Sequence, residues 1–170
     1  LLVALPPAQA QERPAYSQAE LDQMLAPIAL YPDSLLSQVL MAATYPLEVV
    51  EAARWSRAHP GLQGDEAVRA AQDKDWDPSV KSLCTLPDVL KKMSENLDWT
   101  QDLGDAFLGQ KKEVLDAVQR MRANAKEAGH LESTNQQTVT VENEIIVIES
   151  SDPEVIYVPT YSPVVVYTSP

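Results

Sequence analysis

The segment LYPDSLLSQVLMAATYP, residues 30–46, shows in miniature how most of this chain is built. Four of its apolar residues recur at helical spacing, namely Leu35, Leu36, Val39 and Leu40. Two Tyr-Pro pairs, Tyr31-Pro32 and Tyr45-Pro46, stand fourteen residues apart. Proline suits the first turn of a helix, where its missing N–H has no partner to lose. The segment therefore predicts short helices that are opened by proline and joined by tight turns.

Similar start signals lie on both sides of this segment. Upstream, Ser17 and Glu20 have the spacing of a capping box. Downstream, further helix starts are expected at Asp65, Asp77-Pro78, Leu86-Pro87 and Asp98. The last and longest helix should run from Asp98 to Gly129, a suitable C-terminal stop. Residues 18–130 are thus predicted to form about six or seven short helices in a compact bundle, because no heptad persists.

The remaining residues, 131–170, change in character. They are rich in Val, Ile, Thr and Tyr, which suit a pleated surface. Two strands are predicted, Thr138–Ile148 and Val155–Tyr167, with turn chemistry at residues 150–153 between them. A helical region followed by strands excludes parallel βαβ folds and predicts an α+β fold, a multi-helix domain followed by a C-terminal β-hairpin.

Charge and composition exclude several classes of protein. The chain has 170 residues and a net charge of -12, so it repels phosphate backbones and we expect no nucleic-acid partner. No Gly-rich phosphate loop can be drawn, and the single Cys84 excludes an internal disulfide. No apolar run approaches ~20 residues, so no transmembrane segment is expected after the leader. We expect neither a cofactor nor a bound metal.

The first ten residues, LLVALPPAQA, have the pattern of the end of a secretory signal peptide. An apolar stretch precedes a small-x-small cleavage site at Ala8-Gln9-Ala10. The chain begins with Leu1, so its charged n-region is expected upstream. Residues 11–17 would then be a polar leader, and the protein would be exported. The alternative is an apolar N-terminus without a targeting role.

Five motifs in order resemble one bacterial family. The first is the opening segment, residues 30–46; the others are VVEAARW at 49–55, WDPSVKSL at 76–83, LGDAF at 103–107 and YVPTYSPVVVY at 157–167. Together they resemble domain-of-unknown-function family 3300, over about residues 20–167. The resemblance implies export in Gram-negative bacteria, to the periplasm or outer envelope, and often a low-complexity tail beyond the domain. It implies no catalytic residue.

Two groups of carboxylates invite a chemical interpretation. Asp73, Asp75 and Asp77 alternate as Ca²⁺ ligands do in an EF-hand loop, but Pro78 and Cys84 occupy the positions that need Gly and Glu. Whether these three bind a cation is left open, beside the interpretation that Asp77 caps a helix. The other group, Asp98, Asp102 and Asp105, shares one helix face. Paired carboxylates serve glycosidases, but acids also stabilise a first turn.

Trp76 and Trp99 each follow an Asp at a predicted helix start. They are expected to pack over the core, although a sugar-stacking platform is the alternative. His59 and His130 are expected at helix ends, where a cation suits the helix dipole. Cys84 is expected to be a small buried hydrophobe.

The second predicted strand carries the candidate partner-binding residues. At a two-residue period, one face presents Tyr157, Pro159, Tyr161, Pro163 and Tyr167. Proline removes ladder donors, so at least one edge of this strand should stay unpaired. The segment is interpreted either as an edge protected against aggregation or as a docking strand with an aromatic and proline face.

These observations favour a secreted cell-envelope protein that acts as a non-enzymatic interaction or scaffold module. Its partner would be an envelope protein or a cell-wall component. The alternative is an envelope hydrolase that acts on peptidoglycan or polysaccharide through carboxylates and Trp platforms. Its discriminating feature would be a cleft with converging titratable groups.

Overall fold

The computed structural model describes residue 4 and residues 15–168. Within them, eight helices precede a two-stranded antiparallel sheet near the C-terminus, which confirms the predicted α+β class. Apart from residue 4, the predicted signal-peptide segment 1–10 lies outside the described residues, as do residues 11–14 of the polar leader.

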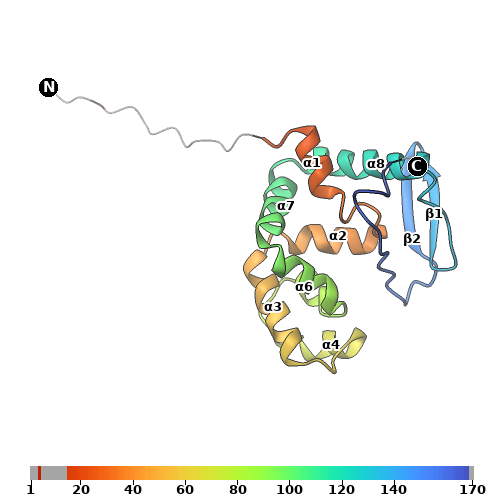
Figure 1. Ribbon diagram of the computed structural model, residues 1–170. Coiled ribbons are helices and arrows are strands. Elements are labelled where there is room, and N and C mark those ends of the chain that lie inside the picture. The colour runs from red at the N-terminus through yellow and green to blue at the C-terminus, as the bar shows by residue number, and fades with distance from the viewer. Residues whose placement is uncertain (1–3, 5–14, 169–170) are drawn as a thin grey trace.

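The helices are short and follow one another closely. Their bounds are α1 Gln18–Leu25, α2 Asp33–Ala42, α3 Pro46–Ala58, α4 Gly64–Ala70, α5 Pro78–Leu83, α6 Pro87–Glu95, α7 Leu97–Gly109 and α8 Lys111–Glu127. The strands are β1 Gln137–Glu142 and β2 Ile145–Ser150. Figure 1 shows α3 and α7 on the left side of the molecule and the hairpin on the right.

Most of the local start signals are confirmed. Ser17 and Glu20 make both hydrogen bonds of a capping box at α1. Proline occupies the first turn of α3, α5 and α6, and Asp77 caps α5 by accepting a hydrogen bond from the Ser79 amide. Pro32 differs slightly, since it precedes the first residue of α2.

The predicted long helix from Asp98 to Gly129 is wrong, because the chain breaks at Gln110 into α7 and α8. Asn96, not Asp98, occupies the N-cap position of α7, and Asp98 lies in its first turn. At the break, the Gln110 side-chain amide accepts from the Tyr16 N–H at 2.8 Å and donates to the Tyr16 carbonyl at 3.0 Å. The break thus fastens the start of the chain to the bundle.

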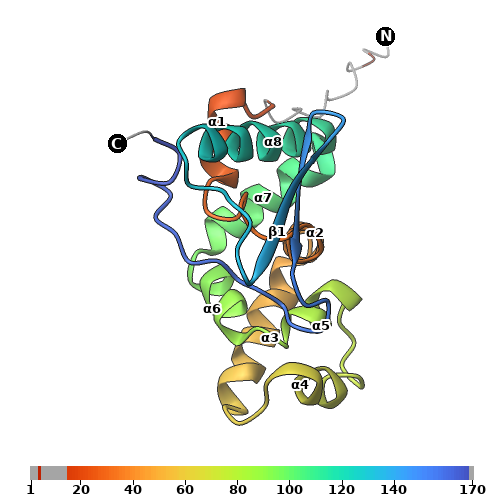
Figure 2. The ribbon, with the colours of Figure 1, turned by 90° about the vertical axis from the view of Figure 1, so that its right-hand side faces the viewer.

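The core is one large apolar cluster that runs through the helices. Its largest fully buried side chains include Leu21, Leu25, Leu40, Leu83, Leu90 and Leu103. A second, smaller cluster joins α8 to the hairpin through Ala125, Leu131, Ile146, Ile148 and Val166. β2 packs against α2 and α8, and Figure 2 shows the hairpin running beside both helices.

The hairpin lies earlier in the chain than predicted, because the first predicted strand alone contains nearly all of both observed strands. The hairpin spans residues 137–150, nearly all of them within the segment expected to be the first strand, and it turns back at Asn143 and Glu144. Both residues have positive φ, 50° and 67°, as a two-residue type I′ turn requires. The sequence signal is weak because the turn has Asn-Glu, not Asn-Gly.

Residues 155–168, here called the C-terminal strap, form no strand. The prediction of a strand over Val155–Tyr167 is therefore wrong. Pro159 and Pro163 lack the N–H groups that a ladder needs. The predicted turn does exist, since the Asp152 carboxylate accepts from the Glu154 amide, but it leads into an irregular segment.

Candidate functional site

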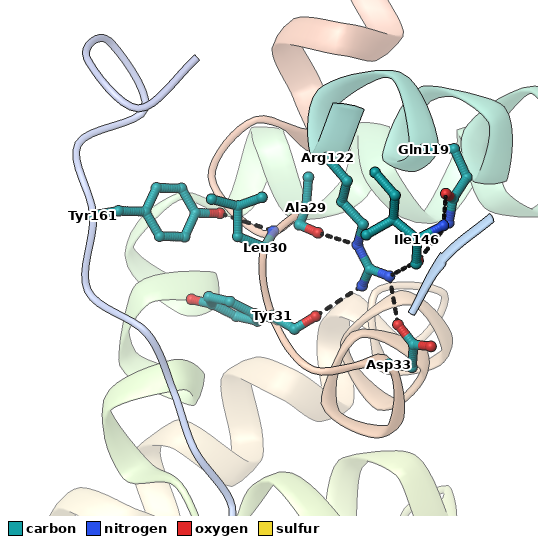
Figure 3. A network of polar contacts seen from close by, with 8 residues as sticks. All are labelled: Ala29, Leu30, Tyr31, Asp33, Gln119, Arg122, Ile146 and Tyr161. Atoms are coloured by element: carbon teal, nitrogen blue, oxygen red, sulfur yellow. Dashed lines mark hydrogen bonds and ion pairs between the residues drawn. The ribbon is translucent and has the colours of Figure 1, made fainter. Parts of the chain in front are cut away.

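A buried arginine joins the C-terminal region to the helices. Arg122 of α8 is only 1% exposed. Its Nε donates to the Ala29 carbonyl at 2.8 Å, and its terminal nitrogens reach the Tyr31 carbonyl at 2.9 Å, the Ile146 carbonyl at 2.8 Å and the Asp33 carboxylate at 2.6 Å. Figure 3 shows these partners converging on one guanidinium from the α1–α2 loop, α2 and β2.

The outer edge of β2 is closed by a neighbouring side chain. Gln119 accepts from the Ile146 N–H at 2.8 Å and donates to the Ile146 carbonyl at 3.1 Å. A primary amide paired in this way imitates one residue of an adjacent strand. On β1, the Ser133 hydroxyl likewise contacts the N–H and carbonyl of Val139. Side chains from the same chain thus partly satisfy the outer edges of both strands. The edge that was predicted to stay unpaired belonged to the second predicted strand, Val155–Tyr167, which does not form.

Two of the five predicted partner-binding residues turn inward. Tyr161 donates to the Ala26 carbonyl at 3.0 Å and accepts from the Leu30 amide at 3.4 Å. Tyr167 donates to the same Ala26 carbonyl at 2.5 Å, and the two rings meet edge to face at 6.4 Å. Burial raises the pKa of Tyr161 far above its ordinary value, and it raises the pKa of Tyr167 to about 12. Both tyrosines anchor the strap.

The other three predicted residues lie nearer the surface. Tyr157 and Pro159 are half-buried and Pro163 is exposed. Tyr157, Pro159 and Tyr161 line one cleft of about 280 Å³, whereas Pro163 is not part of its lining. The structure therefore brings three of the five together but does not present all five on one face.

The strap turns aliphatic side chains outward instead. Val164 is 81% exposed and Val165 58%, and Val155 and Ile156 are also exposed. On the hairpin, Val141 and Ile145 are exposed beside the turn. With its tyrosines held on Ala26, the strap presents short apolar pairs to solvent.

The cleft under the strap also holds polar groups. His130 Nδ1 lies 2.8 Å from the Val166 carbonyl, so this nitrogen carries the hydrogen. Gln137 is buried; its amide nitrogen donates to the Glu132 carbonyl, whereas its side-chain oxygen has no partner among the described atoms.

The predicted carboxylate groups are not drawn into one centre. Asp73 and Asp75 are exposed, and Asp77 is engaged with Ser79. Asp98, Asp102 and Asp105 are exposed on α7, and Asp102 accepts from the Tyr16 hydroxyl at 3.3 Å. Among residues 15–168, no group of three His, Cys, Asp or Glu side chains converges as a metal site would require.

The tryptophans and the cysteine have structural surroundings. Trp99 packs on the core and donates from Nε1 to the Met24 carbonyl at 2.9 Å. Trp76 packs on the same core, donates to the Glu51 carboxylate at 3.1 Å and meets Trp55 edge to face. Cys84 is fully buried, and burial raises its pKa to about 11, which suits the predicted inert hydrophobe.

Sequence reasoning missed Gln119 and Arg122. Arg122 lies four residues after Val118 and three before Ala125, on the buried face of α8. A basic residue at a position that helical spacing assigns to the core is a signal for an internal partner. Gln119 adjoins the same face but carries no comparable signal, because glutamine is common on exposed helix surfaces.

Comparisons with known proteins agree on one family. The family described as "Protein of unknown function (DUF3300)" matches residues 17–169. The chain is 42% identical to "Uncharacterized protein YacH" of Escherichia coli strain K12, over 97% of this chain and 32% of that protein. It therefore spans about a third of the length of this relative. No solved structure matches the chain. Among the described residues, no helix combines the length and apolar character needed to cross a bilayer.

Proposed function

This chain belongs to the DUF3300 family of proteins of unknown function, and we propose that it is an exported, non-enzymatic interaction module of the cell envelope. In this proposal the chain contacts an envelope protein or a cell-wall component in the periplasm or outer envelope of a Gram-negative bacterium. The signal-peptide pattern of residues 1–10 supports export.

One observation carries the proposal: the strap holds apolar side chains in water on a fixed support. Val164 and Val165 are both more than half exposed, although the neighbouring Val166 is buried and Tyr167 is anchored on Ala26. An apolar pair held in place loses little freedom on binding, which favours association. Tyr157, Pro159 and Pro163 lie along the same strap and would extend the contact, with Tyr161 and Tyr167 supporting it from within.

The charge of this region restricts the partner. Residues 131–170 contain six acidic residues and no Lys or Arg. A partner surface that is neutral or basic is therefore favoured, and added salt should weaken the contact.

Site-specific crosslinking tests the proposal. A photoreactive residue at position 165, in cells that export the full chain, should give crosslinked products of discrete mass. The same residue at position 66, on exposed α4, serves as the matched control. In a second experiment the photoreactive residue stands at position 157. The products captured there should be lost when Val164 and Val165 are both changed to Ser. Equal capture from positions 165 and 66 would count against a strap-centred contact.

A second assay separates this proposal from a hydrolase. The purified chain, incubated with peptidoglycan, should release no soluble sugar or peptide. Release that disappears in the triple variant Asp98→Asn/Asp102→Asn/Asp105→Asn would replace the proposal with the hydrolase alternative.

A further inference from the structure

A second apolar surface lies where the α2–α3 corner meets α7. A cavity of about 530 Å³ there is lined mainly by Tyr45, Pro46, Leu47 and Leu97. A neighbouring cavity of about 410 Å³ is lined by residues that include Thr44, Gly104 and Leu108. Both cavities share Pro46 and Gln101, so they form one continuous depression, here called the α3–α7 groove.

Large apolar side chains stand exposed along the groove. Leu47 is 64% exposed, Leu108 73% and Tyr45 41%. A single exposed leucine needs no explanation, but apolar side chains from two elements that line the same depression mark an interaction site.

The groove is preformed, because its floor is made by close backbone packing. A Cβ placed on Gly104 would lie 2.1 Å from the Ala43 carbonyl oxygen, so α7 meets the end of α2 at a distance that only glycine permits. Pro46 begins α3 beside this contact and offers no N–H to solvent. A depression fixed in this way requires no rearrangement to receive a ligand.

The rim of the groove is acidic. Glu48 lines one cavity, Asp102 and Asp105 line the other, and among the described residues neither lining contains Lys, Arg or His. The negative field continues beyond the rim. Asp77 above all, and also Glu48, raise the pKa of the Tyr45 phenol.

Charge decides among the possible occupants. A second copy of this chain has a net charge of -12 and would be repelled, as would an anionic lipid surface. An apolar floor between carboxylates is complementary to a segment that carries aliphatic anchors beside Lys or Arg.

We infer that the α3–α7 groove binds a short, basic amphipathic segment of a partner protein, with its aliphatic side chains against Leu47 and Leu108 and its basic side chains beside Asp102 and Asp105. This site is additional to the proposed strap contact, since α3 and α7 lie on the side of the molecule away from the hairpin (Figure 1).

The test uses a fluorescent 14-residue peptide of Leu and Lys at helical spacing, and measures its binding to the intact chain by fluorescence anisotropy. The double variant Leu47→Ser/Leu108→Ser should weaken binding about tenfold or more. The double variant Asp102→Asn/Asp105→Asn should weaken it less and should reduce its dependence on salt.

Matched controls separate a groove from general attraction between a cation and an acidic protein. Leu115→Ser changes an exposed leucine of α8, and Asp65→Asn/Glu66→Gln removes two exposed acids of α4. Both should leave the affinity unchanged, and a Leu/Glu peptide of the same pattern should not bind. The inference is overturned if the α4 variant weakens binding as much as the α7 variant, or if the Leu/Glu peptide binds equally well.

A last arm keeps this inference separate from the proposed function. Loss of peptide binding in Val164→Ser/Val165→Ser, with the groove variants unaffected, would place the peptide on the strap. That result would overturn the groove and would support the strap contact.

Discussion

The helical region and the C-terminal region of this chain are held together by different means. The helices begin at local signals, such as the Ser17 capping box and the prolines of α3, α5 and α6, and they bury aliphatic side chains in one cluster. The hairpin and strap add only a small apolar cluster and depend on polar side chains from elsewhere in the chain. The first region is therefore encoded locally, whereas the second takes its position from α8 and from the α1–α2 loop.

The largest expected effect comes from Arg122, where the two regions join. Changing Arg122 to Met should cost about 3 kcal/mol or more in the free energy of unfolding. The physical reason is that the Ala29 and Tyr31 carbonyls and the Asp33 carboxylate lose this donor at once, while the Ile146 carbonyl keeps only its bond from Gln119. Urea unfolding followed by circular dichroism measures this cost.

Arg120→Met is the matched control for Arg122. Arg120 lies two residues away and pairs with Asp22 at 2.7 Å, but its side chain is about a third exposed. The Arg120→Met variant should lose well under half as much free energy of unfolding as Arg122→Met, because partly exposed ion pairs contribute little. Equal costs for the two variants would contradict the role given to Arg122.

The next effect lies wholly within the helical region. Gly104→Ala should destabilise the chain by about 1–3 kcal/mol, because the new methyl group meets the backbone oxygen of Ala43, which cannot move aside alone. Gly109→Ala is the control, since nothing lies within 4 Å of a Cβ at that position. Thermal melts of both variants compare the two glycines, and a neutral Gly104→Ala would contradict the close α2–α7 contact.

A smaller effect tests the closed edge of β2. Gln119→Ala should cost about 1–2 kcal/mol, because the N–H and carbonyl of Ile146 lose an amide partner. Hydrogen exchange should accelerate at Ile146 and its neighbours in β2 while the amides of α3 and α6 stay protected. Asn124→Ala, an exposed position on the same helix, is the control. Uniform acceleration in all elements would mean that the hairpin does not open separately.

The difference between the locally encoded helices and the C-terminal region also explains which features were predictable from the sequence. The α+β class and most helix starts could be predicted because each depends on a few adjacent residues. The hairpin was misplaced because Asn143-Glu144 is a weak turn signal and because alternating residues such as Tyr157 and Tyr161 imitate a strand. The break at Gln110 was missed although Gly109 directly precedes it, and the partner that Gln110 binds there, Tyr16, lies 94 residues away in sequence.

The candidate site was predicted only in part, for a related reason. The two-residue period placed Tyr157, Pro159, Tyr161, Pro163 and Tyr167 together, but periodicity cannot say which side faces the protein. That choice depends on the Ala26 carbonyl, which accepts from both Tyr161 and Tyr167. Its availability follows from the end of α1 at Leu25, just before Pro27, and no local pattern in the strap reports it.

The smallest effect concerns the tyrosine anchors and appears only at alkaline pH. Burial holds the pKa of Tyr161 and Tyr167 above the ordinary value of 10.0, to about 12 for Tyr167, so the folded chain keeps both phenols protonated after the unfolded chain has begun to lose these protons. Their contribution to stability is therefore complete below about pH 10 and is lost as the pH rises from there toward 12. The double variant Tyr161→Phe/Tyr167→Phe should melt a few degrees below the wild type at pH 8, because the Ala26 carbonyl loses both donors, and this difference in melting temperature should shrink steadily above pH 10.

The comparison with wild type is needed because other groups titrate in the same range. The raised pKa values of Tyr31 and Cys84 lower the stability of both proteins as the pH rises, whereas the lowered pKa of Lys92 acts in the opposite direction. Tyr157→Phe, a change on the same strap, is the control and should not lower the melting temperature at pH 8. A difference in melting temperature that stays constant from pH 8 to pH 11.5 would mean that the two phenols are not anchored in a buried setting, and the strap would then have to be held by its other contacts, such as the bond between His130 and the Val166 carbonyl.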